Sequence, residues 1–155
     1  MHLRRTGIMI SFVALMALVM SLWGGMAGAE KVPDAAHGGR PLSTALSGAN
    51  EVPPAVDPDS TGSAVITLNR GLGEVCWEIT TAGVEPVVAA HIHRAPVGVN
   101  GPVVVPLTAV QNGTASGCAS VPRTLIDEIM ADPTGFYVNV HTTVFPGGAL
   151  RGQLG

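Results

Sequence analysis

The segment GSAVITLNRGLGEVCWEITT, residues 62–81, has the clearest structural pattern in the sequence. Its first half places apolar side chains at every second position, the period of a strand with one buried face. These side chains are Ala64, Ile66 and Leu68. The glycine-rich link RGLG at 70–73 is short enough for a hairpin turn into the run 74–81. The stretch therefore predicts two antiparallel strands joined by a tight turn.

Similar runs recur roughly every ten residues along the chain. The expected strands cover residues 42–52, 62–69, 74–81, 87–94, 103–110, 114–121, 136–144 and 149–154. The chain holds 20 glycines and 12 prolines, and many of them separate these runs. Many short strands with such turns are typical of all-β domains. We therefore expect an antiparallel Greek-key sandwich or flattened barrel of about eight strands.

One segment, RTLIDEIMA at 123–131, has a helical pattern instead. Its apolar stripe consists of Leu125, Ile126 and Ile129. Thr124 can cap the start together with Asp127, three residues later, and Pro133 stops the helix. We expect this to be the one substantial helix of the domain.

The beginning of the chain has the features of an export signal. Arg4 and Arg5 precede an almost continuous apolar run over 8–22, and Ala27-Gly28-Ala29 is similar to a cleavage site. A run of about 15 residues is short for a membrane span, which needs about 20. We predict a removed secretory signal at 1–29, in preference to an uncleaved anchor. A flexible leader at 30–41 and one domain at 42–155 follow it.

Charge narrows the range of partners. Without residues 1–29 the chain has 6 basic and 11 acidic residues, a formal net charge of −5, and its basic residues are scattered. Such a surface argues against nucleic acid and anionic lipid as partners. We expect a secreted protein, periplasmic or extracellular, without membrane insertion once the signal is removed. Its partner would be an extracytoplasmic protein or ligand.

The chain has two cysteines, Cys76 and Cys118. An even count in an exported protein favours a disulfide. The alternatives are a catalytic thiol, which would be open to oxidation outside the cytoplasm, and metal ligands, for which the C-x-x-C spacing is missing. We predict a Cys76–Cys118 bond with Cα atoms within about 7 Å.

Two segments hold every histidine of the predicted domain: AHIH at 90–93 and YVNVHT at 137–142. Strand side chains two apart share a face, so His91 and His93 point the same way. Tyr137, Asn139 and His141 likewise share one face of their own strand. If the two strands are neighbours, His91, His93 and His141 can converge. Three imidazoles suit copper or zinc, and no other cofactor is indicated.

Other polar residues could complete such a site. Glu51 is a candidate fourth ligand or outer hydrogen-bonding group, and Asn139 could hydrogen-bond an imidazole. Arg151 could pair with Glu51 or with a carbonyl at a strand end. The competing interpretation is a buried polar network in which the histidines and Asn139 hold the strands together. His37, in the leader, could also bind metal, although its setting is typical of a linker.

The residues give no positive reason to expect an enzyme. The chain has no G-x-S-x-G serine, no glycine-rich phosphate loop before a helix, and only scattered acids. A hydrolase stays conceivable, because a catalytic site is defined by geometry and not by sequence order.

Three separated motifs resemble the CHRD (chordin-type) domain family. They are LSGANEVPP at 46–54, AHIH at 90–93 with GVNGPVV at 98–104, and YVNVHT at 137–142 with FPGGALRGQL at 145–154. The resemblance extends over 42–154 and implies a secreted single domain that acts as a non-enzymatic binding or structural module. Growth-factor antagonism is not implied, because the chain has one copy and no cysteine-rich modules.

A more distant resemblance is to copper/zinc superoxide dismutase, another Greek-key β-barrel. There a strand His-x-His pair and a later strand histidine bind copper, and His91, His93 and His141 are similar. The dismutase also needs a bridging imidazole and further zinc ligands, for which this domain has too few histidines. The resemblance therefore implies copper binding as a hypothesis, without dismutation. The alternative function is a copper-binding redox protein with a three-histidine site.

Overall fold

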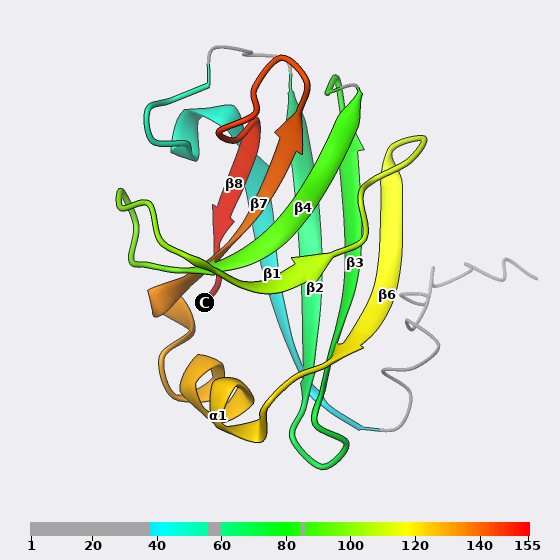
Figure 1. Ribbon diagram of the computed structural model, residues 1–155, viewed down its shortest axis with the longest axis vertical. Coiled ribbons are helices and arrows are strands. Elements are labelled where there is room, and N and C mark those ends of the chain that lie inside the picture. The colour runs from blue at the N-terminus through cyan, green and yellow to red at the C-terminus, as the bar shows by residue number, and fades with distance from the viewer. Residues whose placement is uncertain (1–37, 56–59, 85) are drawn as a thin grey trace, which may run out of the picture.

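The computed structural model describes residues 38–55, 60–84 and 86–155. Eight strands form one antiparallel sheet in the order β5-β4-β7-β8-β1-β2-β3-β6. They are β1 (Arg40–Ser47), β2 (Thr61–Asn69), β3 (Glu74–Ala82), β4 (Val87–Arg94), β5 (Val103–Leu107), β6 (Thr114–Ser120), β7 (Phe136–Thr142) and β8 (Leu150–Gln153). The sheet curls until its end strands, β5 and β6, contact each other (Figure 1). This nearly closed barrel confirms the predicted fold class.

The hairpin predicted from residues 62–81 is the pair β2 and β3. The two strands are in register over their whole length, with Ile66 opposite Trp77. The turn closes where the Gly73 N–H donates to the Asn69 carbonyl at 2.9 Å. Gly73 has a φ of 71°, a left-handed conformation that glycine adopts without steric cost.

Strand β1 is shorter than the expected 42–52. It ends at Ser47, where the chain turns into the short 3-10 helix η2 (Gly48–Asn50). The Ser47 hydroxyl accepts a hydrogen bond from the Ala49 N–H at 3.2 Å and so caps this turn. Glu51 consequently follows a turn instead of lying in the sheet.

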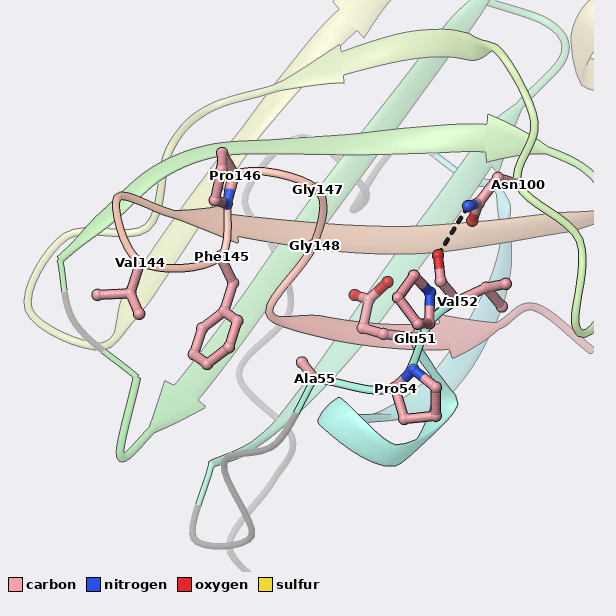
Figure 2. Close-up of a pocket in the computed structure, with 11 residues that line it drawn as sticks. Glu51, Val52, Pro54, Ala55, Asn100, Val144, Phe145, Pro146, Gly147 and Gly148 are labelled. Atoms are coloured by element: carbon pink, nitrogen blue, oxygen red, sulfur yellow. Dashed lines mark hydrogen bonds between the residues drawn. The ribbon is translucent and has the colours of Figure 1, made fainter.

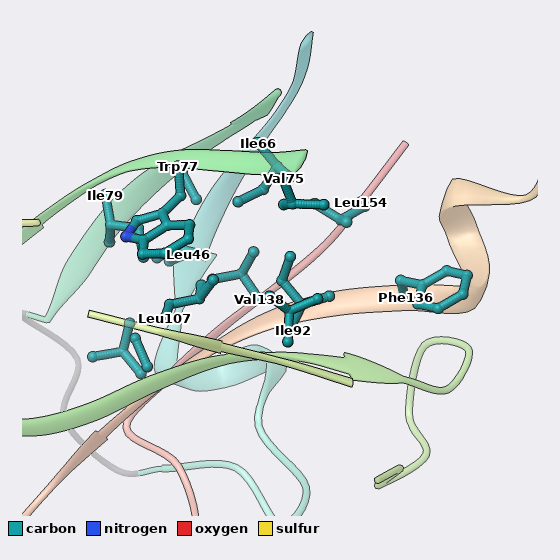
Figure 3. Close-up of a cluster of buried hydrophobic side chains, with 14 of the residues drawn as sticks. Leu46, Ile66, Val75, Trp77, Ile79, Ile92, Leu107, Phe136, Val138 and Leu154 are labelled. Atoms are coloured by element: carbon teal, nitrogen blue, oxygen red, sulfur yellow. The ribbon is translucent and has the colours of Figure 1, made fainter. Parts of the chain in front are cut away.

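The core lies on the concave face of the barrel (Figure 3). The alternating apolar positions of the strands face one another there, and their side chains are almost completely buried. They include Leu46, Ile66, Val75, Trp77, Ile79, Ile92, Val138 and Leu154. Successive residues of a strand face opposite sides of the sheet, so the polar residues that alternate with these apolar ones lie on the convex face. That face of β4 and β7 carries the histidines.

The predicted helix is confirmed as α1 (Arg123–Ala131), at one end of the barrel (Figure 1). Leu125, Ile126 and Ile129 are its buried residues. The predicted Thr124 cap is wrong: the N-cap is Pro122, without a side-chain cap hydrogen bond. The physical reason is that the helix already begins at Arg123, so Thr124 lies inside its first turn and cannot be the cap.

The predicted disulfide is present between neighbouring strands. Cys76 of β3 and Cys118 of β6 are directly opposite in the ladder, with Cα atoms 4.0 Å apart and a bonded S–S distance of 2.10 Å. In the part of the chain that the structure describes, no helix is long and apolar enough to span a membrane. The predicted signal, most of the leader and His37 lie outside the described residues.

Candidate metal centre

Strands β4 and β7 are neighbours in the sheet, and this brings the two histidine segments together. His91 is opposite Asn139, His93 is opposite Tyr137, and Ala89 is opposite His141. The intervening residues, such as Ile92, Val138 and Val140, are completely buried in the core. All three imidazoles therefore project from the convex face of the barrel.

The three imidazoles converge on one small volume. One nitrogen from each ring lies within 4.8 Å of the other two. The ring centroids are 5.0 Å apart for His91 and His141, 5.6 Å for His91 and His93, and 6.0 Å for His93 and His141. A tetrahedral ion with bonds of about 2.0–2.1 Å needs nitrogens about 3.4 Å apart. Side-chain movements on the order of 1 Å would close that difference.

Backbone carbonyls determine which nitrogen of two rings is free. Nδ1 of His93 lies 2.9 Å from the Gly101 carbonyl, and Nδ1 of His141 lies 3.0 Å from the Pro146 carbonyl. A carbonyl can only accept, so each Nδ1 carries the proton and each Nε2 keeps its lone pair. Both Nε2 atoms, and Nδ1 of His91, are buried without a hydrogen-bond partner. Metal-binding histidines have this arrangement, in which the second nitrogen donates to a carbonyl.

The environment favours the neutral form of the three rings. Burial is the largest cause that lowers the pKa of each histidine. Mutual repulsion adds to this for His91, next to His141 and His93, and for His141, next to His93. The carbonyl hydrogen bonds of His93 and His141 act in the opposite direction. Neutral imidazole is the form that binds metal.

Arg151 of β8 fixes the loop that carries the Gly101 carbonyl. Its Nη2 donates to the carbonyls of Pro96 at 3.1 Å and Val99 at 2.8 Å, and its side chain is 1% exposed. The guanidinium also lies 3.5 Å from the centre of the Tyr137 ring, which stacks on His93 at 4.8 Å. The two predicted partners of Arg151 are Glu51 and a carbonyl at a strand end. The hydrogen-bond partners of Nη2 in the structure are backbone carbonyls, but they belong to a loop.

Glu51 and Asn139 form a separate pair beside this cluster. Asn139 Nδ2 donates to Glu51 Oε1 at 2.5 Å and to the Leu150 carbonyl at 3.4 Å. The predicted bond from Asn139 to an imidazole is absent, since that amide is used by Glu51. Glu51 is not in the three-histidine group, because it follows η2 and extends toward Gly148. Burial raises its pKa to about 7, while Arg151 and Asn139 oppose the shift.

Sequence reasoning missed the two carbonyls that orient His93 and His141. The motifs Gly101-Pro102 and Pro146-Gly147-Gly148 indicate turns, but nothing in them shows where a carbonyl points. Gly101 has a further signal: a Cβ there would lie 1.9 Å from the Arg94 carbonyl oxygen. The close approach of the two segments therefore requires glycine.

The fold and the cluster define an all-β domain with a three-histidine group on its convex face. The family model of the CHRD domain matches residues 42–154, and the chain belongs to this family. Searches of curated proteins and of solved structures found no match. CHRD is an extracellular domain family, and the Cys76–Cys118 disulfide fits an oxidising environment. Membership is compatible with a non-enzymatic binding module.

Proposed function

We propose that this CHRD chain is a non-enzymatic extracytoplasmic binding module whose ligand is one copper or zinc ion, held by His91, His93 and His141. Two observations carry the proposal: each of the three rings has a buried nitrogen without a hydrogen-bond partner among the described residues, and one nitrogen from each ring lies within 4.8 Å of the other two. Buried polar atoms are nearly always paired, and each unpaired one costs about 1–3 kcal/mol. A single ion would satisfy all three.

The competing interpretation, a buried polar network, requires each histidine to be hydrogen-bonded to the backbone or to Asn139. His93 and His141 have such backbone bonds, whereas Nδ1 of His91 has no partner in the described part of the chain. Asn139 instead donates to Glu51 and Leu150. His93 and His141 each make a hydrogen bond through Nδ1, which orients the ring. Nε2 of each ring still has no hydrogen-bond partner within the described ranges. This favours a ligand set over a structural network.

The donor set suits either of the two ions. Imidazole nitrogens bind copper and zinc well, and three of them leave a position for water or another small ligand. The alternative function is a copper redox protein, and one observation favours it: the Tyr137 ring, an oxidisable group, stacks on His93 at 4.8 Å. Reversible reduction of the bound copper would support the redox alternative. Zinc binding with release of copper upon reduction would support the binding module.

Titration of the purified protein with Cu(II) and with Zn(II) tests the proposal. We expect one equivalent of metal per chain and a loss of affinity of at least about tenfold in His93→Ala and His141→Ala. The control is His37→Ala, which changes a histidine of the predicted leader and which the proposal expects to leave binding unchanged. Binding that survives both cluster variants, or that is lost in the His37→Ala control, would contradict the three-histidine site.

A further inference from the structure

A cavity of about 330 Å³ lies beside the histidine cluster, between the segment that follows η2 and the loop that joins β7 to β8. Its size is within the range of small-molecule sites. The walls are mainly apolar and come from residues including Pro53, Pro54, Val144 and Phe145 (Figure 2). None of the three clustered histidines lines it.

A buried carboxyl group forms one wall of this cavity. Glu51 is 5% exposed, and its carboxyl group points toward the 144–148 loop (Figure 2). Oε1 accepts the Asn139 hydrogen bond, whereas Oε2 has no hydrogen-bond partner among the described residues. A Cβ at Gly148 would lie 2.5 Å from Oε2, so the missing side chain makes room for the carboxylate. The cavity therefore has a hydrogen-bond acceptor with spare capacity.

The same walls have few hydrogen-bond donors. Three of the lining residues are prolines, which have no N–H: Pro53, Pro54 and Pro146. The Asn100 amide already donates to the Val52 carbonyl at 2.7 Å. Nη2 of Arg151 donates to two loop carbonyls. Arg151 and Glu51 do not form an ion pair, since no nitrogen of Arg151 lies within 4 Å of a Glu51 carboxylate oxygen. The Glu51 carboxylate therefore disfavours an anionic ligand and favours one that donates a hydrogen bond.

We propose that this cavity binds a primary ammonium group on a short apolar stem, as in an aliphatic amine or a lysine-like side chain. The ammonium donates to Glu51 Oε2 in a charge-assisted hydrogen bond, and the stem packs against Val144, Phe145 and the prolines. The negative charge of the chain, with more acidic than basic residues, favours the approach of cations.

Binding of n-pentylamine to the metal-free protein tests this site, because amines also ligate copper and zinc. At about pH 8.5 the Glu51 carboxyl, with its pKa of about 7, is ionised and the amine is still mostly protonated. We expect the backbone amide NMR signals of 51–55 and 144–148 to shift. Pentan-1-ol, which has the same stem without the charge, should bind at least about tenfold more weakly.

The variant Glu51→Gln keeps the shape and the Asn139 contact but removes the charge, and should weaken pentylamine binding about tenfold or more. Glu78→Gln in β3, outside the cavity, is the matched control and should bind like the wild type. His93→Ala should also bind the amine normally, which separates this site from the metal proposal. Equal affinities for amine and alcohol, no effect of Glu51→Gln, or no binding in the millimolar range would overturn the inference.

Discussion

The carboxyl group of Glu51 is the clearest single-residue departure from ordinary ionisation in the described chain. It is 5% exposed, lies against Gly148 and accepts a hydrogen bond from Asn139. Burial raises its pKa from 4.5 to about 7 in spite of Arg151. Ionisation of this group therefore opposes folding at neutral pH.

The pH dependence of stability follows from that shift. Between pH 4.5 and about 7 the folded state holds a proton on Glu51 that the unfolded state has released, so stability falls as pH rises through this window. The loss is at most roughly 3 kcal/mol. Glu51→Gln should not show this loss. Its unfolding free energy should therefore increase relative to that of the wild type as pH rises. Urea unfolding across this range measures the difference.

The histidines contribute a separate dependence of the opposite sign. Their pKa values are lowered in the folded state, so stability is lost as pH falls below 6.5, where the unfolded histidines take up protons. The wild type and Glu51→Gln have the same histidine contribution. It therefore cancels when the unfolding free energies of the two proteins are subtracted. Parallel stability curves for the two proteins would refute the Glu51 prediction.

Gly101 is the residue on which the orientation of His93 depends most directly. Since a Cβ would lie 1.9 Å from the Arg94 carbonyl oxygen, Gly101→Ala must displace the loop and its carbonyl from His93 Nδ1. We expect metal affinity to fall by about 10–100-fold in a titration with Zn(II). Gly147→Ala is the control, because a Cβ there has open space around it. Equal affinities in the two variants would contradict this role.

At the scale of elements, strand β8 and the 95–101 loop act as one unit through Arg151. Arg151→Lys removes the guanidinium group, whose Nη2 donates to both the Pro96 and Val99 carbonyls, and a lysine side chain is not an equivalent replacement. Unpaired carbonyls should cost about 2–4 kcal/mol of unfolding free energy, measured in urea. Arg123→Lys is a matched control: Arg123 also donates to two loop carbonyls, of Arg70 and Gly71, but at an exposed site. Its effect should stay below about 0.5 kcal/mol. Similar losses in both variants would contradict the loop-anchoring role.

The disulfide joins β3 to β6, one of the two end strands of the sheet. Replacing both Cys76 and Cys118 by Ser should lower the unfolding free energy by about 3–4 kcal/mol, because the loop of 42 residues becomes unconstrained in the unfolded chain. Hydrogen exchange should accelerate first in β6, which pairs with β3 at this end of the sheet order. Wild-type stability in the double variant would show that ladder pairing alone holds the strand.

For the whole molecule, the central prediction is export with removal of residues 1–29. The purified exported protein should begin at Glu30, because the basic head, the apolar run and Ala27-Gly28-Ala29 form a signal with a cleavage site. Intact mass and N-terminal sequencing measure this. Recovery of the chain with residues 1–29 attached to a membrane fraction would instead indicate an uncleaved anchor.

Several features of the molecule were predictable from the sequence because they depend on local patterns. Period-two runs predict the strands and the side each residue faces, as in the hairpin β2–β3 and in the shared direction of His91 and His93. The helix at 123–131 follows from its apolar stripe. The disulfide follows from the presence of two cysteines in the chain.

Local patterns do not predict which strands become neighbours or where loop carbonyls point, because both depend on contacts between distant segments. The pairing of β4 with β7 joins segments more than forty residues apart, and the carbonyls of Gly101 and Pro146 select the free nitrogen of the His93 and His141 rings. The contacts of Glu51 with Asn139 and Gly148, and of Arg151 with the 95–101 loop, are also long-range. Hydrophobic period is a property of neighbouring residues, whereas these hydrogen bonds exist only after the barrel has closed.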